Sequence, residues 1–161
     1  MKLDPKTFLE VVKLSPLVSI DLIVRDPQGR VLLGLRANRP AQNTWFVPGG
    51  RIAKDERIAA ALVRVAHEEL GVELNPSQAH FLGVYEHLYP DNFANELGID
   101  THYIVLAHEV RLEHLPDELP ADQHHAFRWF TVPELLSDPQ VHPNTKAYFS
   151  SPTWPVARTN E

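Results

Sequence analysis

Two adjacent acids end a segment of helical spacing, and a pair of glycines lies just before that segment. Residues 56–70 carry apolar side chains three or four positions apart, as amphipathic helices do, and Glu68 and Glu69 lie in the last turn. Gly49 and Gly50 end the apolar stretch before it, where a backbone without side chains can approach a ligand closely. Carboxylate oxygens suit Mg2+, so the pattern indicates a site for a divalent cation and a phosphate group.

Position 65 decides how much metal this helix can bind. On a helix, positions 65, 68 and 69 share one face, because they are spaced i, i+3 and i+4. Val65 stands where a third carboxylate would complete an anionic patch, so one charge and one ligand are missing. We therefore expect a single metal ion. Arg64 and Glu68 are four residues apart and are expected to pair, and an ordinary solvated helix face is the alternative reading of either glutamate alone.

Length, composition and charge restrict the class of protein. With 161 residues, the chain is expected to form one domain over 1–161 with a core of ordinary size. The net charge of −6 argues against a nucleic-acid partner, and the absence of cysteine excludes disulfides and thiolate metal sites. No apolar run reaches the ~18 residues that span a bilayer, and residues 1–16 lack the apolar centre of a signal peptide. We therefore expect a cytoplasmic protein with no membrane partner.

The order of the elements predicts an α/β fold. Asp4, followed by proline, is a good N-cap, so a short helix is expected over 5–13. Asp55 and Gly71 are the expected N-cap and C-cap of the helix over 56–70. The other expected elements are a hairpin of strands at 16–24 and 31–36, strands at 45–50, 79–89, 101–110 and the end of 121–131, helices at 132–138 and 144–150, and a loose tail at 152–161. Several strands around one long helix favour an α/β/α sandwich with a mixed central sheet.

The spaced residues over 50–72 match one motif in register. The matching residues are Gly50, Glu56, Arg64, Glu68, Glu69, Gly71 and Val72. This set resembles the box of the Nudix hydrolases, in which a glycine, a glutamate, an arginine and clustered glutamates recur at fixed intervals. The departure is Val65, which stands where that family has its first clustered glutamate. The resemblance implies the Nudix fold and a metal-dependent hydrolase.

Segments outside the box extend the resemblance to one branch of that family, the GDP-mannose mannosyl hydrolases. The segments that carry it are "SPLVSIDL", "NRPAQNTWFVPGGR", "DNF" at 91–93, "THY" at 101–103 and "DQHHAFRW" at 122–129. That branch also lacks the first clustered glutamate, so Val65 agrees with it, but the branch usually lacks a glutamate at position 68 as well. The resemblance implies hydrolysis of GDP-mannose and GDP-glucose to GDP and free hexose, with water attacking sugar C1 with inversion.

The resemblance also implies a metal site and a base. One Mg2+ per subunit, replaceable by Mn2+, is expected on Glu69, Gln123 and the main-chain carbonyl of Gly50, with Glu68 as a further contact. His124 is the expected base, in a polar and mobile loop, because a neutral imidazole titrates near working pH. The neighbouring His125 leaves an ambiguity, and we prefer His124 because it follows Gln123 as in the family pattern.

Five further residues are expected around the diphosphate and the sugar. Arg36 and Arg51 are expected to bind the diphosphate through their guanidinium groups, with ordinary surface arginines as the alternative. Tyr103 is expected to donate its hydroxyl to the leaving group, or else to pack in the core. Asp21 interrupts an apolar strand, which is costly unless the carboxylate is paired, so we expect it to stabilise positive charge on the sugar or to bind its hydroxyls. His87 is a further candidate on the sugar side, with a structural histidine as the alternative.

The N-terminal segment is expected to help hold the nucleotide across the interface of a homodimer, as the resemblance implies. Phe8 is the candidate to stack on guanine, and a helix-packing role is the alternative. Lys2 and Leu3 are expected to act through their backbone.

Two other functions remain open at this stage. An ordinary Nudix pyrophosphohydrolase, which cleaves a nucleoside diphosphate derivative at phosphorus, is favoured by the presence of both Glu68 and Glu69. A nucleotide-sugar-binding module without activity is favoured only by Val65. The sequence does not decide between mannose and glucose, which differ in the configuration of one hydroxyl.

Overall fold

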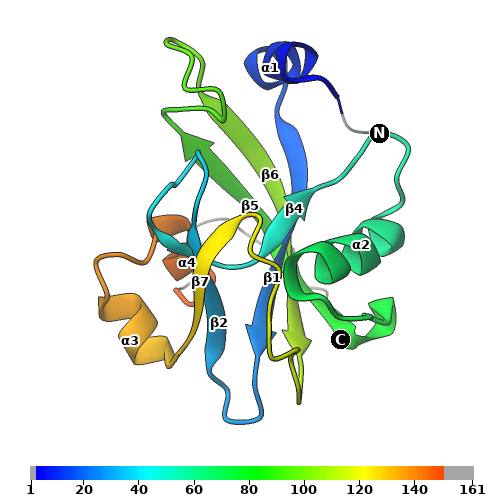
Figure 1. The fold of residues 1–161 in the computed structure, drawn as a ribbon, viewed down its shortest axis with the longest axis vertical. Coiled ribbons are helices and arrows are strands. Elements are labelled where there is room, and N and C mark those ends of the chain that lie inside the picture. Colours follow the sequence, from blue (N-terminus) through cyan, green and yellow to red (C-terminus); the bar gives the residue numbers. More distant parts are fainter. Residues whose placement is uncertain (1–2, 151–161) are drawn as a thin grey trace, which may run out of the picture.

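A seven-stranded mixed sheet lies between helices in the structure, a computed structural model that describes residues 3–150 (Figure 1). The strands are β1 (Leu17–Arg25), β2 (Val31–Arg36), β3 (Trp45–Phe46), β4 (Gly49–Arg51), β5 (Ala79–Tyr89), β6 (Thr101–Arg111) and β7 (His124–Phe130). The helices are α1 (Pro5–Leu14), α2 (Ile58–Leu70), α3 (Val132–Ser137) and α4 (Pro143–Ala147), with a 3-10 turn, η1 (Pro76–Gln78). The expected α/β/α sandwich is confirmed, while Lys2 and the tail over 152–161 lie outside the described residues.

Strand β1 organises the sheet, because three strands pair with it. Strands β2 and β4 run antiparallel to β1, and β6 runs parallel to it. The order is β3-β2-β1-β6-β5, with β7 paired to β2. The expected hairpin is confirmed by the pairing of Arg25 with Val31. The single strand expected over 45–50 is instead two short strands, since β3 pairs with β2 whereas β4 pairs with β1.

Helix α2 covers one face of the sheet. Its side chains Leu62, Val65 and Leu70 are buried against Ile20 and Leu22 of β1. Their spacing places them on one side of the helix, which is the apolar stripe that the sequence predicts. This packing fixes the position of the box helix relative to the central strand.

Two of the three caps expected for α1 and α2 are confirmed. Asp4 caps α1, since its side chain accepts hydrogen bonds from two amides of the first turn. Gly71 ends α2 in the left-handed conformation, with φ at 66°. The expected cap at Asp55 is wrong, because α2 begins after Arg57 and Asp55 lies in an exposed turn with φ at 65°.

A second core cluster lies on the opposite face of the sheet. Ile23 of β1, Phe130 of β7, Leu135 of α3 and Val141 belong to it, and Tyr148, just after α4, packs against it. The end of the described chain therefore returns to the middle of the sheet. Within residues 3–150, no helix is long and apolar enough to cross a membrane.

Candidate active site

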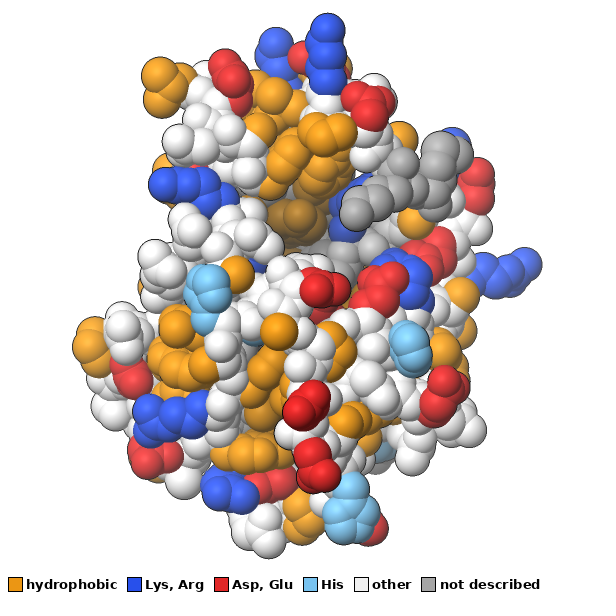
Figure 2. Space-filling view, in the orientation of Figure 1, with side chains coloured by type: hydrophobic (Ala, Val, Ile, Leu, Met, Phe, Trp, Pro, Cys, Tyr) orange, Lys and Arg blue, Asp and Glu red, His pale blue; other side chains and the backbone are white. Residues whose placement is uncertain are grey.

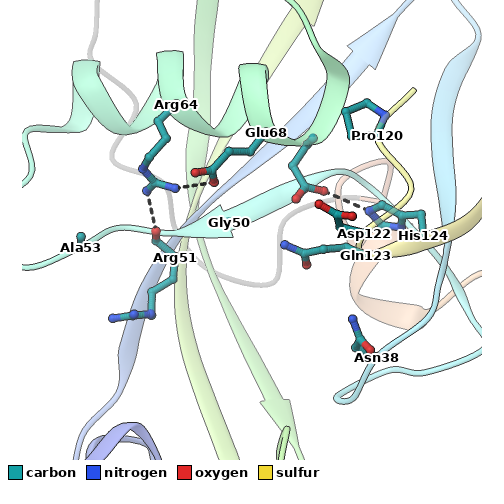
Figure 3. A pocket seen from close by; sticks show the side chains of 11 residues that line it. Asn38, Gly50, Arg51, Ala53, Arg64, Glu68, Pro120, Asp122, Gln123 and His124 are labelled. Carbon is teal, nitrogen blue, oxygen red and sulfur yellow. Dashed lines mark hydrogen bonds and ion pairs between the residues drawn. The ribbon is translucent and has the colours of Figure 1, made fainter. Parts of the chain in front are cut away.

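Arg64 binds the box helix α2 to the strand and loop that precede it. Its guanidinium donates to both carboxylate oxygens of Glu56, at 2.7 and 2.8 Å, and to the carbonyl of Arg51 at 2.9 Å. It also donates to Glu68 at 2.8 Å, which confirms the expected pair (Figure 3). Glu56 accepts the amide of Ala53 at 2.9 Å as well. The hydrogen bonds from Arg64 lower the pKa of Glu56 to about 2, so this carboxylate stays charged and bound at neutral pH.

Val65 lies directly beneath the glycine strand. It is 0% exposed, and a Cβ added to Gly50 would meet its Cγ2 at 3.0 Å. Of the three positions expected to share a face, Glu69 is also buried, whereas the Glu68 side chain is 55% exposed and turns toward Arg64. Valine at position 65 therefore fills the core, and only Glu69 of the expected face is buried against the site.

The expected metal ligands Gly50, Glu69 and Gln123 line one cavity of about 680 Å3, the box cavity (Figure 3). Residues 3–150 contain no group of three His, Asp or Glu side chains arranged to hold a metal ion. The expected set needs no such group, because it combines one carboxylate, one amide oxygen and one main-chain carbonyl, all hard oxygen donors. The residues present therefore fit one divalent cation. Glu68 lies at the same cavity but is engaged by Arg64.

His124 lies elsewhere than expected. It is the first residue of β7 and is 2% exposed, so the expected mobile loop position is wrong. Its Nε2 lies 3.1 Å from Oε2 of Glu69, and Nδ1 has no hydrogen-bond partner within the described chain. The ring lies over Gly34, where any side chain would collide with it. The physical reason is strand pairing, since β7 joins β2 from His124 onward, and His125 is exposed.

A second cavity of about 240 Å3, the sheet cavity, adjoins the box cavity. Its lining includes six residues predicted from the sequence for the substrate: Phe8, Asp21, Arg36, Arg51, His87 and Tyr103. They come from six different elements, so only the folded sheet brings them together. Gly50, Arg51 and Gln123 line both cavities and form a shared wall. Figure 2 shows the surface hollowed below α1, with apolar side chains above the hollow and charged side chains beside it.

Asp21 is a buried carboxylate held from two sides. It pairs with Gly49 across β1 and β4, and a side chain at position 49 would collide with its Oδ1. Its Oδ2 accepts a hydrogen bond from the hydroxyl of Tyr148 at 2.6 Å. Burial raises the pKa of Asp21 to about 7, although the Tyr148 hydroxyl and the charge of Arg36 oppose that rise. The glycine at position 49 thus makes room for an acid, as well as for a ligand.

Three residues that sequence reasoning misses surround His87. Tyr148 has its hydroxyl 3.2 Å from Nε2 of His87, and Tyr89 has its hydroxyl 3.5 Å from Nδ1. The ring of His142 is tilted against that of Tyr89, with the centroids 5.6 Å apart. Burial, followed by the nearby His142, lowers the pKa of His87 to about 3, so this imidazole is neutral. For Tyr148 and His142, the sequence shows only that a histidine and a tyrosine lie in or beside the helical segment near the end of the chain. This pattern does not connect them to the site.

The two arginines are oriented by neighbouring groups. Arg36 donates from Nε to the carbonyl of Pro40 at 2.9 Å. The guanidinium carbon of Arg51 lies 4.6 Å from the ring centroid of Phe8, a cation–π contact. Phe8 in turn packs on Phe93, with the ring centroids 4.9 Å apart. Phe93 is a neighbour of the site that the sequence analysis did not assign.

Tyr103 and the N-terminal residues complete the account of the expected site. Burial raises the pKa of Tyr103, so its hydroxyl keeps its proton and can donate a hydrogen bond into the sheet cavity. Leu3 is partly buried and is not among the lining residues of either cavity. Lys2 lies outside the described residues.

The sandwich packs a glutamate-bearing helix against a glycine strand and holds two adjoining cavities lined by charged and polar side chains. Carboxylate and guanidinium groups of this kind suit a divalent cation and phosphate oxygens. The sequence profile of the NUDIX domain matches residues 15–150. The chain therefore belongs to the Nudix family of hydrolases.

Relatives of known name or structure agree with this family. The chain is 41% identical over 143 residues to the low-salt glycan biosynthesis protein Agl8 of Haloferax volcanii, covering 88% of this chain and 85% of that protein. A MutT NUDIX hydrolase from Burkholderia pseudomallei is 27% identical with a TM-score of 0.63, covering 84% of this chain and 97% of that one. A MutT protein from Methanosarcina mazei Go1 has a TM-score of 0.65 at 18% identity, covering 83% and 91%, and so supports the fold alone.

Proposed function

We propose that the protein hydrolyses GDP-mannose, and also GDP-glucose, by attack of water on C1 of the sugar, releasing GDP and the inverted hexose. The observation that carries the proposal is the pair of adjoining cavities with a shared wall. The box cavity offers oxygen ligands to a divalent cation and Arg51 to a diphosphate, and the sheet cavity offers the buried carboxylate of Asp21. A buried anion beside the sugar favours positive charge developing at C1, as in glycosidases.

The relationship to Agl8 supports a sugar-containing substrate. That protein is named for glycan biosynthesis, and its similarity extends over most of both chains. Val65 agrees with the proposal, because a buried valine supplies no metal ligand at the position of the first clustered glutamate of the family.

The residues of the two cavities divide the work. Glu69, Gln123 and the carbonyl of Gly50 would hold Mg2+, or Mn2+ in its place, which supplies neutralisation of the diphosphate leaving group. Arg51 and Arg36 bind diphosphate oxygens from the sheet side, where guanidinium groups match their geometry. With its charge neutralised in this way, GDP needs no general acid to leave.

His124 is the proposed base, and its environment sets a condition on that role. Its Nε2 is occupied by Glu69 at 3.1 Å and its Nδ1 is enclosed over Gly34. Proton abstraction from water therefore requires the contact between His124 and Glu69 to open. Glu69 can release Nε2 only when another partner takes its carboxylate oxygen.

A specific observation also favours the second function, cleavage at phosphorus. Glu68 and Glu69 both line the box cavity together with Arg64, which is the arrangement of a pyrophosphohydrolase with one ligand removed. GMP and a sugar 1-phosphate would then be the products.

The two functions are separated by the position of an isotopic label. GDP-mannose, GDP-glucose and ADP-ribose are incubated with the protein and Mg2+ in 18O water, and the products are identified by mass spectrometry. We expect GDP and labelled hexose. Label in GDP, in GMP or in sugar 1-phosphate would establish cleavage at phosphorus, and nucleotide binding without turnover would support a binding module.

We also propose a cytoplasmic homodimer. An observation in its favour is the edge strand β5, whose Leu82, Val84 and Leu88 are exposed large apolar side chains. Sedimentation equilibrium tests the assembly directly, and a mass of one chain at micromolar concentration would contradict it.

A further inference from the structure

Tyr148 joins the end of the described chain to the acid of the central strand. It follows α4, and its hydroxyl donates to Oδ2 of Asp21 at 2.6 Å. The same hydroxyl lies 3.2 Å from Nε2 of His87, whose Nδ1 lies 3.5 Å from the hydroxyl of Tyr89. Four polar side chains from β1, β5 and the chain after α4 thus form one connected line.

The direction of each hydrogen bond in this line follows from the number of O–H and N–H donors that each side chain has. Tyr148 has one hydroxyl proton and gives it to Asp21, so Nε2 of His87 must donate to the oxygen of Tyr148. A neutral imidazole carries a single N–H, which leaves Nδ1 as an acceptor for Tyr89. Every donor therefore points toward the carboxylate, and each bond strengthens the next.

The line leaves one oxygen of the acid free. Within residues 3–150, Oδ2 of Asp21 is engaged by Tyr148 and no hydrogen bond is made to Oδ1. Asp21 lines the sheet cavity together with His87 and Tyr89, and Gly49 leaves the space beside Oδ1 unfilled. Tyr148 itself is not among the residues that line the cavity.

We propose that Tyr148 is a positioning residue, which holds Asp21 by one oxygen so that the other is presented to the sugar in the sheet cavity. The proposal rests on the proposed function for the identity of the ligand. It adds that the chain after α4 controls the sugar side of the site without touching the sugar. Loss of the hydroxyl frees the Asp21 side chain to rotate and reduces sugar recognition, while the diphosphate contacts stay intact.

The test is a double-mutant cycle with Tyr148→Phe and Asp21→Asn. Tyr148→Phe is expected to lower kcat/KM for GDP-mannose by about 10- to 100-fold, the usual worth of a hydrogen bond to a charged group. In the Asp21→Asn background the same change is expected to cost less than about 3-fold, because the charged acceptor is gone. The affinity for GDP alone, measured by calorimetry, is expected to stay within about 2-fold in Tyr148→Phe, because GDP has no sugar to contact Asp21.

Tyr85→Phe is the matched control. The ring of Tyr85 packs on that of Tyr148 with the centroids 4.7 Å apart, and its hydroxyl makes no hydrogen bond within the described residues. This variant is expected to keep full activity. Equal losses from Tyr148→Phe in both backgrounds, or equal losses of GDP and GDP-mannose binding, would overturn the positioning role.

The outcome is separable from that of the proposed function. If the 18O experiment shows cleavage at phosphorus, the cycle is still measured on that reaction, and coupling between Tyr148 and Asp21 then supports the positioning role. If the enzyme attacks C1 but the cycle shows no coupling, the proposed function stands and the inference about Tyr148 fails.

Discussion

The two cavities are built in opposite ways. The box cavity takes most of its charged groups from the box itself, where Arg64 links Glu56 and Glu68 through short ion pairs, and adds Asp122 from the segment before β7. The sheet cavity takes Asp21 and His87 from strands far apart in the sequence, and Tyr148, which does not line the cavity, hydrogen-bonds to both.

The surroundings also shift the pKa of a carboxyl group in opposite directions in the two regions. In the box, the ion pair with Arg64 lowers the pKa of Glu56 to about 2, so its carboxylate is stabilised by an opposite charge. In the sheet cavity, burial raises the pKa of Asp21 to about 7, and the hydroxyl of Tyr148 is what opposes that rise most. In the box, the carboxylate of Glu56 is therefore stable in its charged form. In the sheet cavity, burial destabilises the charged form of Asp21, so a ligand that brings positive charge beside it is favoured.

The largest expected effect tests whether the box cavity supplies the base. His124→Gln should lower kcat by roughly 10²–10⁴-fold, the usual contribution of a general base. His125→Gln, at an exposed position, is the matched control and should leave kcat unchanged. Thermal unfolding of both variants checks folding, and an unchanged kcat in folded His124→Gln would remove this residue from the mechanism.

The next effect tests whether Val65 is a core residue beneath the box cavity or stands at a position where a metal ligand is tolerated. Val65→Glu restores the family's glutamate but places a carboxylate at a position that is 0% exposed beneath Gly50. An unpaired buried charge should lower the free energy of unfolding by about 3–5 kcal/mol. Val65→Ala, which makes only a small cavity, should cost clearly less. Urea unfolding measures both, and equal stability of Val65→Glu and wild type would show that position 65 is free to act as a ligand.

Gly49→Ala perturbs the sheet cavity beside Asp21. The added Cβ would collide with Oδ1 of Asp21, and displacing a reacting group by about 1 Å costs on the order of 10²-fold. We expect that loss in kcat/KM for GDP-mannose with little change in GDP affinity. If steady-state kinetics and calorimetry show that both fall together, then Gly49 serves the diphosphate rather than Asp21. The added Cβ would also meet the main-chain carbonyl of Ile20, so thermal unfolding of the variant checks that it folds.

The smallest expected effect concerns the stability of the box. Glu56→Gln should lower the free energy of unfolding by about 1–2 kcal/mol at pH 7, since a charge-assisted bond to a partly exposed arginine is lost. The pKa of Glu56 is depressed from 4.5 to about 2, so its contribution is present above pH 4.5 and is lost as pH falls toward 2. Wild type and Glu56→Gln should thus converge in acid. Glu68→Gln, on the same arginine but 55% exposed, should cost less at pH 7.

The sequence predicts the box better than the sheet cavity, for a physical reason. Helical spacing relates Arg64 to Glu68, and strand periodicity locates Asp21, because each depends on neighbours in the chain. The contact between Tyr148 and Asp21 joins residues 127 positions apart, and no local sequence pattern predicts it. The polar neighbours of His124 predict a loop, but pairing with β2 places this residue in a strand and buries it.

The shared wall of Gly50, Arg51 and Gln123 gives the two cavities a physical route for coupled binding. A ligand that shifts this wall from one side changes the free energy of binding on the other. Such coupling is reciprocal. The factor by which a bound cation changes the affinity for the sugar equals the factor by which a bound sugar changes the affinity for the cation. A cation held in the box cavity would then be bound more tightly when a substrate occupies the sheet cavity.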